Sequence, residues 1–190
     1  MLILKTNPFG LDAEIEKLQT KLHTDLLATW GIQSSSYKCY GRAYRNKTED
    51  GYIAECYTGS GNYKEVYYDD TLSAISFFGI SDKITIEDAA KVNVHMVYFV
   101  NLKKVKPNAT DRPDDEVRND VLYSLGAGLT SINVTSVELT VENALKEYPG
   151  SMRENRLKYV DMHPAHCFRI NLELSYVPEN NNCKPFSNIQ

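Results

Sequence analysis

The stretch Val92-Asn93-Val94-His95-Met96-Val97-Tyr98-Phe99-Val100 is apolar at nearly every position. A strand with one wet face alternates apolar and polar residues, whereas a strand covered on both faces is an almost continuous apolar run. This stretch therefore predicts the central strand of a sheet with both faces covered. Other segments of the chain must supply its neighbouring strands and the layers that cover it.

A helix is predicted from Leu11 to Trp30, and it suits one of the covering layers. Apolar residues recur there at steps of three and four, which gives a single apolar stripe: Leu11, Ile15, Leu18, Leu22, Leu26 and Trp30. Asp12 is expected to cap the start of this helix, and Gly31 fits the left-handed position just past its end. Such a stripe is buried most simply against a sheet.

Further strands are predicted on both sides of the central run. Tyrosine-rich segments at 36–44 and 52–57 flank an Asp50-Gly51 turn, so they predict a β-hairpin. Three more extended segments are expected at 63–68, 72–80 and 134–141. From Phe168 to Tyr176 apolar residues alternate with polar ones, which predicts a half-buried closing strand.

Two shorter helices are also predicted. The polar stretch Lys103–Pro113 leads into the first, which has an acidic opening turn and a buried face: Asp114, Asp115 and Glu116 form the turn, and Val117, Val121, Leu122 and Leu125 form the face. The second is expected at 142–148, where Pro149-Gly150 ends it.

This order of elements does not alternate regularly enough for a doubly wound parallel sheet. It predicts an α+β fold, with a mixed or antiparallel sheet packed against the N-terminal helix and the two shorter helices. A tyrosine-rich hairpin is expected to project at about 44–68. Residues 1–176 are interpreted as one domain, and 177–190 as a polar C-terminal tail.

Composition limits the classes of function. The chain has 190 residues and a formal net charge of -4, so it carries no excess of cations for sequence-independent nucleic-acid binding. It has neither an apolar run of about 20 residues nor a secretory leader, so we expect synthesis in the cytoplasm and no membrane contact. The cysteines lie far apart and are expected to be reduced and buried: Cys39, Cys56, Cys167 and Cys183.

Metal-capable side chains gather just before the closing strand. Asp161, His163, His166 and Cys167 fall within seven residues, and imidazole with thiolate would suit zinc. Because residues along a strand alternate faces, His166 and Cys167 should point apart. We therefore expect a structured turn with no metal, cofactor or catalytic residue, and keep His163 and His166 as candidates for a metal-dependent hydrolase.

Two other groups have an ordinary structural interpretation. His95 could serve as a general base, but no nucleophile or orienting acid accompanies it, so it is interpreted as a core or interface histidine. The carboxylates at 111–116 resemble part of a two-metal site without its second half. They are expected to cap the helix that starts there.

Thirteen tyrosines indicate an interface, because tyrosine combines a large flat ring with a polar group. Eight of them fall between Tyr37 and Tyr68, mostly in the predicted hairpins. A small basic run at Lys103, Lys104 and Lys106 would suit docking of an acidic partner.

Taken in order, the N-terminal helix, the tyrosine-rich hairpins, Val92–Leu102, the helix with the acidic start and the closing strand resemble tailed-bacteriophage neck and tail-terminator proteins. The nearest resemblance is to those of crAss-like phages of Bacteroides-type hosts. It rests on element order and on two stretches, Val97-Tyr98-Phe99-Val100-Asn101-Leu102 and Phe168-Arg169-Ile170-Asn171-Leu172.

The resemblance implies a non-enzymatic virion protein, made in the bacterial host cytoplasm, that forms an oligomeric ring between portal and tail. DNA would cross its channel without sequence-specific binding, and its partners would be further copies and neighbouring portal, neck or tail proteins. The interface residues expected on this basis are Tyr52, Tyr57, Tyr63, Tyr67, Tyr68, Lys103, Lys104, Lys106, Arg112, Arg169 and Tyr176. A further alternative is a monomeric adaptor that binds an extended peptide at an exposed sheet edge such as the closing strand.

Overall fold

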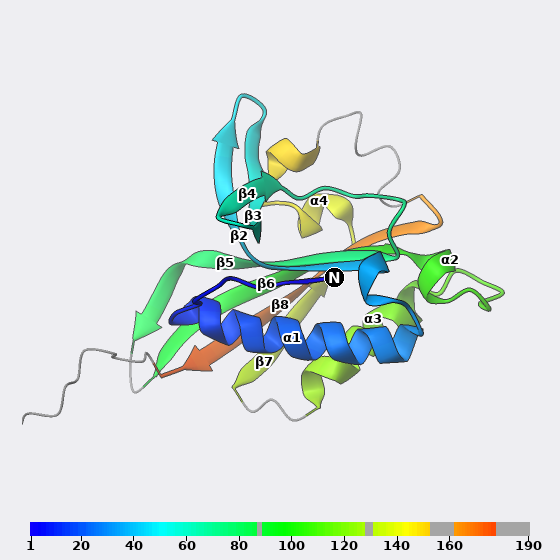
Figure 1. Ribbon diagram of the computed structural model, residues 1–190, viewed down its shortest axis with the longest axis horizontal. Coiled ribbons are helices and arrows are strands. Elements are labelled where there is room, and N and C mark those ends of the chain that lie inside the picture. Colours follow the sequence, from blue (N-terminus) through cyan, green and yellow to red (C-terminus); the bar gives the residue numbers. More distant parts are fainter. Residues whose placement is uncertain (87–88, 128–130, 153–161, 178–190) are drawn as a thin grey trace, which may run out of the picture.

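The computed structural model describes residues 1–86, 89–127, 131–152 and 162–177. It has a mixed α+β fold, which confirms the expected fold class (Figure 1). Its elements are β1 (Leu2–Ile3), α1 (Leu11–Trp30), the 3₁₀ turn η1 (Ser34–Ser36), β2 (Tyr37–Thr48), β3 (Gly51–Gly59), β4 (Asn62–Glu65), β5 (Ala74–Ile86), β6 (Ala90–Asn101), α2 (Leu102–Val105), α3 (Asp114–Gly126), β7 (Ile132–Glu138), α4 (Val141–Ala144), the 3₁₀ turn η2 (Pro149–Met152) and β8 (Ala165–Tyr176). All but the first residue of the expected polar tail lie outside the described residues.

The strands follow the order β4-β3-β2-β5-β6-β8-β7, and β1 pairs with β2 in parallel. β2 and β5 are also parallel, while the other pairs are antiparallel. β6 lies between β5 and β8 and pairs with both along most of its length, so the predicted central strand is confirmed. The expectation that the closing strand is an exposed edge is wrong, because β7 covers the outer side of β8.

β2 serves two sheets. Its first part, Tyr37 to Arg42, pairs with β5 in the main sheet, with a shift of register between Cys39 and Arg42. Its second part, Ala43 to Thr48, pairs with β3. The predicted β-hairpin is therefore confirmed, and it carries β4 as a third strand. Figure 1 shows the tip of this hairpin rising away from the main sheet.

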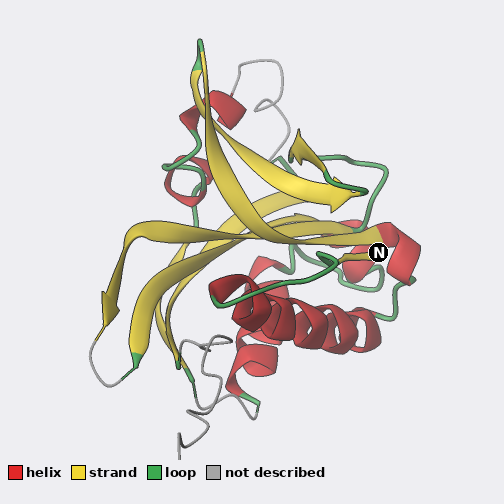
Figure 2. Ribbon diagram, turned by 60° about the vertical axis from the view of Figure 1, so that its left-hand side comes forward, coloured by secondary structure: helices red, strands yellow, loops and turns green. Residues whose placement is uncertain are grey.

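The larger core lies between the main sheet and helices α1 and α3, which occupy one face of it (Figure 2). The predicted apolar stripe of α1 is buried, and Gly31 takes the left-handed conformation past its end, as expected. The capping role assigned to Asp12 is wrong. Gly10 occupies the cap position, and the Asp12 carboxylate lies within the first turn, where it accepts a hydrogen bond from Nζ of Lys5 at 2.6 Å.

A smaller core covers the other face of the main sheet. It is formed by β2, β3, α4 and the residues that follow α4, and its members include Ala54, Cys56, Phe77, Phe99, Leu145, Tyr148 and Cys167. The hairpin is attached here through η2, because the backbone N–H of Ala54 donates to Oγ of Ser151 at 3.2 Å. Both faces of β6 are thus covered, as its apolar run predicts.

Three boundaries differ from the expectations. The stretch after β6 begins with the short helix α2, because Leu102 and Val105 are buried and Oδ1 of Asn101 accepts from the N–H of Lys104. The third helix is shorter than expected, since its chain turns into η2 at Pro149. β5 continues to Ile86, well past the expected end.

None of the helices in the described part of the chain has the length and apolar character that crossing a membrane requires.

A substitution of Gly79 on β5 would test how tightly the smaller core is packed. A Cβ atom at this position would overlap with Nε2 of His95 and with the hydroxyl of Tyr148. Gly79→Ala should therefore lower the free energy of unfolding by roughly 1–3 kcal/mol, as overpacked cores do, in urea denaturation followed by circular dichroism.

Gly126→Ala is the matched control, because a Cβ atom there has no neighbour within 4 Å. It should leave stability unchanged or slightly increased, since alanine is the better helix former. Equal stability of the two variants would contradict the tight packing at Gly79.

Candidate functional site

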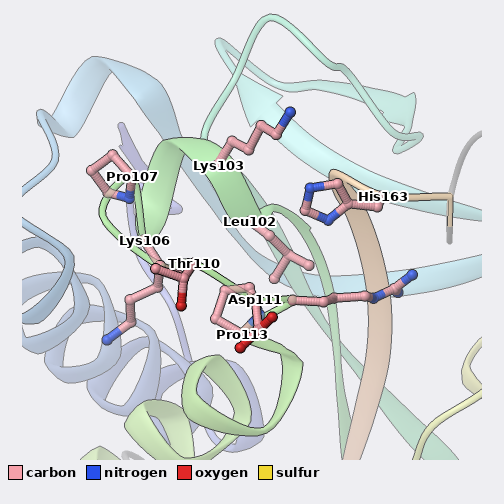
Figure 3. A pocket seen from close by; sticks show the side chains of 10 residues that line it. Leu102, Lys103, Lys106, Pro107, Thr110, Asp111, Pro113 and His163 are labelled. Carbon is pink, nitrogen blue, oxygen red and sulfur yellow. The ribbon is translucent and has the colours of Figure 1, made fainter.

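A pocket of about 510 Å³ lies at the end of the main sheet where β6 passes into α2 (Figure 3). Its floor is Leu102, and its walls come from the loop at 106–113 and from His163. The N–H of Leu102 donates to the carbonyl of Pro164 at 2.7 Å, which holds the two chain segments together. The pocket therefore brings together the expected basic residues Lys103, Lys106 and Arg112 with the metal candidate His163, which is far from them in the sequence.

Most cations around this pocket are already paired. Nζ of Lys106 lies 2.6 Å from the Glu116 carboxylate and 2.8 Å from that of Asp120, and Nζ of Lys104 donates to the carbonyls of residues 70 and 71. Nε of Arg112 donates to the Asp114 carboxylate at 2.7 Å. These side chains fasten the loop to its surroundings.

Lys103 differs from these cations. Its side chain is exposed, and no polar contact to it occurs within the described ranges. In Figure 3 the amine of Lys103 and that of Lys106 point in opposite directions, the latter toward the helices. Among the described residues, Lys103 is thus a cation at this rim with its amine directed away from α3.

The two histidine candidates lie in different settings. His163 is exposed at the pocket, whereas His166 is 3% exposed. Nδ1 of His166 lies 3.1 Å from Asp114 and its Nε2 lies 2.9 Å from Nη1 of Arg118, so both ring nitrogens are engaged. No group of three metal-capable side chains forms a site in the residues that the structure describes. Asp161 and Cys183 lie outside those residues.

The acidic start of α3 forms ion pairs instead of caps. Pro113 occupies the cap position without a side-chain hydrogen bond, so the expected capping by the carboxylates is wrong. Asp114 meets Arg112 and His166, and although burial raises the pKa of its carboxyl, the hydrogen bond from Arg112 and the nearby His166 ring hold it below the ordinary value. Asp115 pairs with Arg118.

His166 and Cys167 lie on opposite faces of β8, as expected. Cys167 belongs to the smaller core, on the opposite face of β8 from His166. The three described cysteines are buried free thiols, and burial raises the pKa of Cys39 to about 11.

The β2–β3 hairpin and β4 form a hairpin unit, and its outer face carries a cluster of tyrosines. The ring of Tyr63 packs edge-on against those of Tyr44 and Tyr57, with centroids 5.8 and 5.6 Å apart. Nζ of Lys5 donates to the hydroxyl of Tyr44 at 2.9 Å and lies 5.1 Å from its ring centroid. Because Lys5 also binds Asp12 on α1, this cluster is anchored to the body of the fold.

The tyrosines expected at the interface differ in exposure. Tyr52 and Tyr63 are 41% exposed and Tyr67 is 51% exposed. Tyr57, Tyr68 and Tyr176 are partly buried, and Tyr68 meets the edge of Phe99 in the smaller core. Tyr63 thus lies on the same face as its ladder partner Tyr57, whereas Tyr52 lies on the face of β3 that also carries Ala54 and Cys56.

Arg169, also expected at the interface, is instead 5% exposed. It forms a two-point ion pair with Glu147, and its Nε donates to Oδ1 of Asn171 at 2.6 Å. Nδ2 of Asn171 donates in turn to Oγ of Ser136 at 2.9 Å and to Glu138 at 3.2 Å. These residues line a second pocket of about 510 Å³, on the face of the main sheet that carries the smaller core.

This second pocket was missed by sequence reasoning, although a signal was present. Asn93 and His95 interrupt the apolar run of β6, and across the ladder they face Glu173 and Asn171 of β8. Two polar residues opposite two more on the neighbouring strand indicate a patch of sheet that no apolar layer covers. Glu147 forms a further wall of this pocket, and nothing in the sequence indicates its position there.

His95 closes one end of the second pocket. Its side chain is 4% exposed, and Nε2 lies 3.2 Å from the hydroxyl of Tyr148. Burial and the nearby positive charge of Arg169 lower the pKa of His95 to about 3. It is therefore a neutral core histidine at pH 7, as expected.

Comparison of the chain with protein-family models, with curated proteins and with solved structures finds no match in any of the three.

The buried His95 predicts a pH dependence of stability. Its pKa is about 3 in the folded chain against about 6.5 when unfolded, so the unfolded chain binds the proton first as the pH falls. The stability that comes from keeping His95 neutral is complete above the unfolded value and is lost as the pH falls from about 6.5 toward 3. Between pH 7 and pH 5 the expected loss is about 2 kcal/mol.

Urea denaturation at a series of pH values would measure this loss. His95→Gln removes the titrating group while keeping a polar side chain, so its stability should fall less over the same interval. Parallel pH profiles for the two proteins would refute the assignment.

Proposed function

We propose that this chain is a non-enzymatic structural subunit of a bacteriophage virion, where it forms an oligomeric ring at the head-tail connector or tail terminator around the DNA channel. It would be made in the host cytoplasm and become part of the neck or tail of the virion. The observation that carries the proposal is the set of exposed tyrosines on the projecting hairpin unit, namely Tyr52, Tyr63 and Tyr67.

Exposed aromatic rings on a projecting element favour contact with another protein. Burying the apolar faces of each ring stabilises the complex, and the hydroxyl can keep a polar partner at the rim of the interface. Tyr63 adds the rings of Tyr44 and Tyr57 behind it, so the surface presented is a cluster and not a single side chain. Packing against a neighbouring copy would cover this cluster.

The hairpin unit is also held in place before any partner binds. On its outer side Lys5 connects Tyr44 to α1, and on its inner side Ser151 binds the backbone of β3. Gly150 lies so close to Gly51 that a Cβ atom would fall 2.8 Å from its carbonyl oxygen. A fixed surface loses less conformational entropy on association, which suits a subunit that must repeat one contact around a ring.

Charge is compatible with this assignment. A net charge of -4 gives the subunit a mildly acidic character, and a channel wall of the same sign as DNA lets the duplex slide without binding. Lys103, at the rim of the pocket in Figure 3, offers a positive contact for an acidic segment of an adjacent neck or tail protein.

The alternative of a metal-dependent hydrolase finds less support. It requires His163 and His166 to share an ion, but both ring nitrogens of His166 are occupied by Asp114 and Arg118. A metal at His166 would have to displace its ion pair with Asp114, whose side chain is 17% exposed.

Light scattering across a concentration series, with electron microscopy of the large species, tests the ring. We expect closed rings at high concentration for the wild-type chain and a loss of rings for the double variant Tyr63→Ser/Tyr67→Ser, because these two exposed rings supply much of the contact area. Truncating an aromatic residue at the centre of an interface typically costs about 2 kcal/mol or more, so the affinity between subunits should fall by roughly thirtyfold or more.

Tyr123→Ser is the matched control, since Tyr123 is 82% exposed but lies on α3. It should assemble as the wild type does. A strict monomer at every concentration, or an equal loss of assembly in both variants, would contradict a ring built through the hairpin unit.

A further inference from the structure

We propose that the outer edge of β7 and the second pocket beside it bind an extended segment of a partner protein, which adds a strand to the main sheet and places one uncharged polar side chain in that pocket. This inference does not depend on the ring. It rests on three features of the described residues: an unpaired edge, a charge-balanced pocket and an apolar strip on the opposite side of the same edge.

β7 is the last strand on its side of the sheet, and β8 is its one partner in the described chain. Its middle residues, 133–136, are exposed. The strand contains no proline or lysine, although a β-bulge at Thr135 shifts its register between Val134 and Ser136. Among the described residues no strand pairs with its outer side, so the backbone donors and acceptors on either side of the bulge can pair with an extended chain.

The second pocket reaches this edge directly. Ser136 and Glu138 of β7 line it together with Arg169 and Asn171 of β8 and His95 of β6. In a strand added to β7, alternate side chains point to the face that holds the pocket. One of them would lie over Ser136 and Glu138, at the open side of the cavity.

The charges around the pocket balance. Arg169 is neutralised by Glu147, and Nζ of Lys146 lies 3.9 Å from Glu138. His95 is uncharged at neutral pH. A charged guest would enter without a counter-ion, and desolvating an unpaired charge is costly.

An amide or hydroxyl suits this lining. The guanidinium of Arg169 has more N–H donors than its bonds to Glu147 and Asn171 use, and Glu138 has further acceptor capacity. A side chain that both donates and accepts hydrogen bonds can satisfy both groups. Asparagine, glutamine, serine and threonine are the residues of this kind.

The opposite face of the same edge is apolar. Val134 is 39% exposed and points to the side of the sheet that carries the larger core, where Ile132 and Val137 lie beside it. The alternate side chains of an added strand would extend this strip, and β-branched apolar residues suit it best. The expected ligand therefore alternates valine-like and uncharged polar residues.

The test uses NMR titration of the uniformly ¹⁵N-labelled full chain with the peptide Val-Thr-Val-Asn-Val-Thr-Val, flanked by lysines for solubility. We expect saturable shifts in the amides of β7 and of the second pocket. Peptides with aspartate or lysine in place of the asparagine should bind at least about tenfold more weakly, because each brings an unpaired charge.

Two variants separate the edge from the pocket. Val134→Lys places a charge on the edge and should abolish binding of all the peptides. Lys146→Glu, at a side chain that is 49% exposed, makes the pocket negative, so the lysine peptide should now bind more tightly than the asparagine peptide. Tyr123→Ser on α3 should bind as the wild type does.

Spectra of the free variants would verify that each remains folded. Absence of saturable shifts up to millimolar peptide, shifts that map elsewhere, or equal binding of the three peptides would overturn the inference. The titration is run at a protein concentration below the onset of ring assembly, so a failure of ring assembly in the preceding experiment would leave these outcomes unaffected.

Discussion

The burial of β6 on both faces is the constraint on which the rest of the structure depends. An apolar strand in the middle of a sheet must be covered twice, and the chain supplies two unlike layers. Helices α1 and α3 form one layer over the larger core, and the β2–β3 hairpin with α4 forms the other over the smaller core. In the part of the chain that the structure describes, the second layer covers only part of this face of the sheet, and the second pocket lies beside it.

This incomplete apolar cover explains why polar residues occur on the face of the sheet that carries the smaller core. Where the apolar layer ends at Tyr148, β6 and β8 carry His95, Arg169 and Asn171 in place of aliphatic residues. Each of these side chains is buried or partly buried with hydrogen-bond partners, since an unpaired polar group in such a place is costly. The site is thus a consequence of the architecture and not of a sequence motif.

The sequence predicts the elements that depend on local periodicity. The α1 stripe, the left-handed Gly31, the hairpin and the central strand all follow from residues close to one another along the chain. The surroundings of Asp12, His166 and Arg169 could not be predicted, because their partners are separated from them along the chain. Lys5, Asp114 with Arg118, and Glu147 become their neighbours only after folding. The position of β8 inside the sheet is also non-local, because the weakly patterned β7 takes the edge.

β2 has a mechanical consequence as a strand shared between two sheets. Its second part carries Tyr44 of the tyrosine cluster, while its first part is paired with β1 and β5 beside the larger core. A force applied to the hairpin along β2 would therefore act as shear on the β2–β5 ladder, which runs from Tyr37 to Arg42 with a shift of register after Cys39. The hydrogen bonds of this ladder would share the load, so a pull on the hairpin would be resisted beside the larger core.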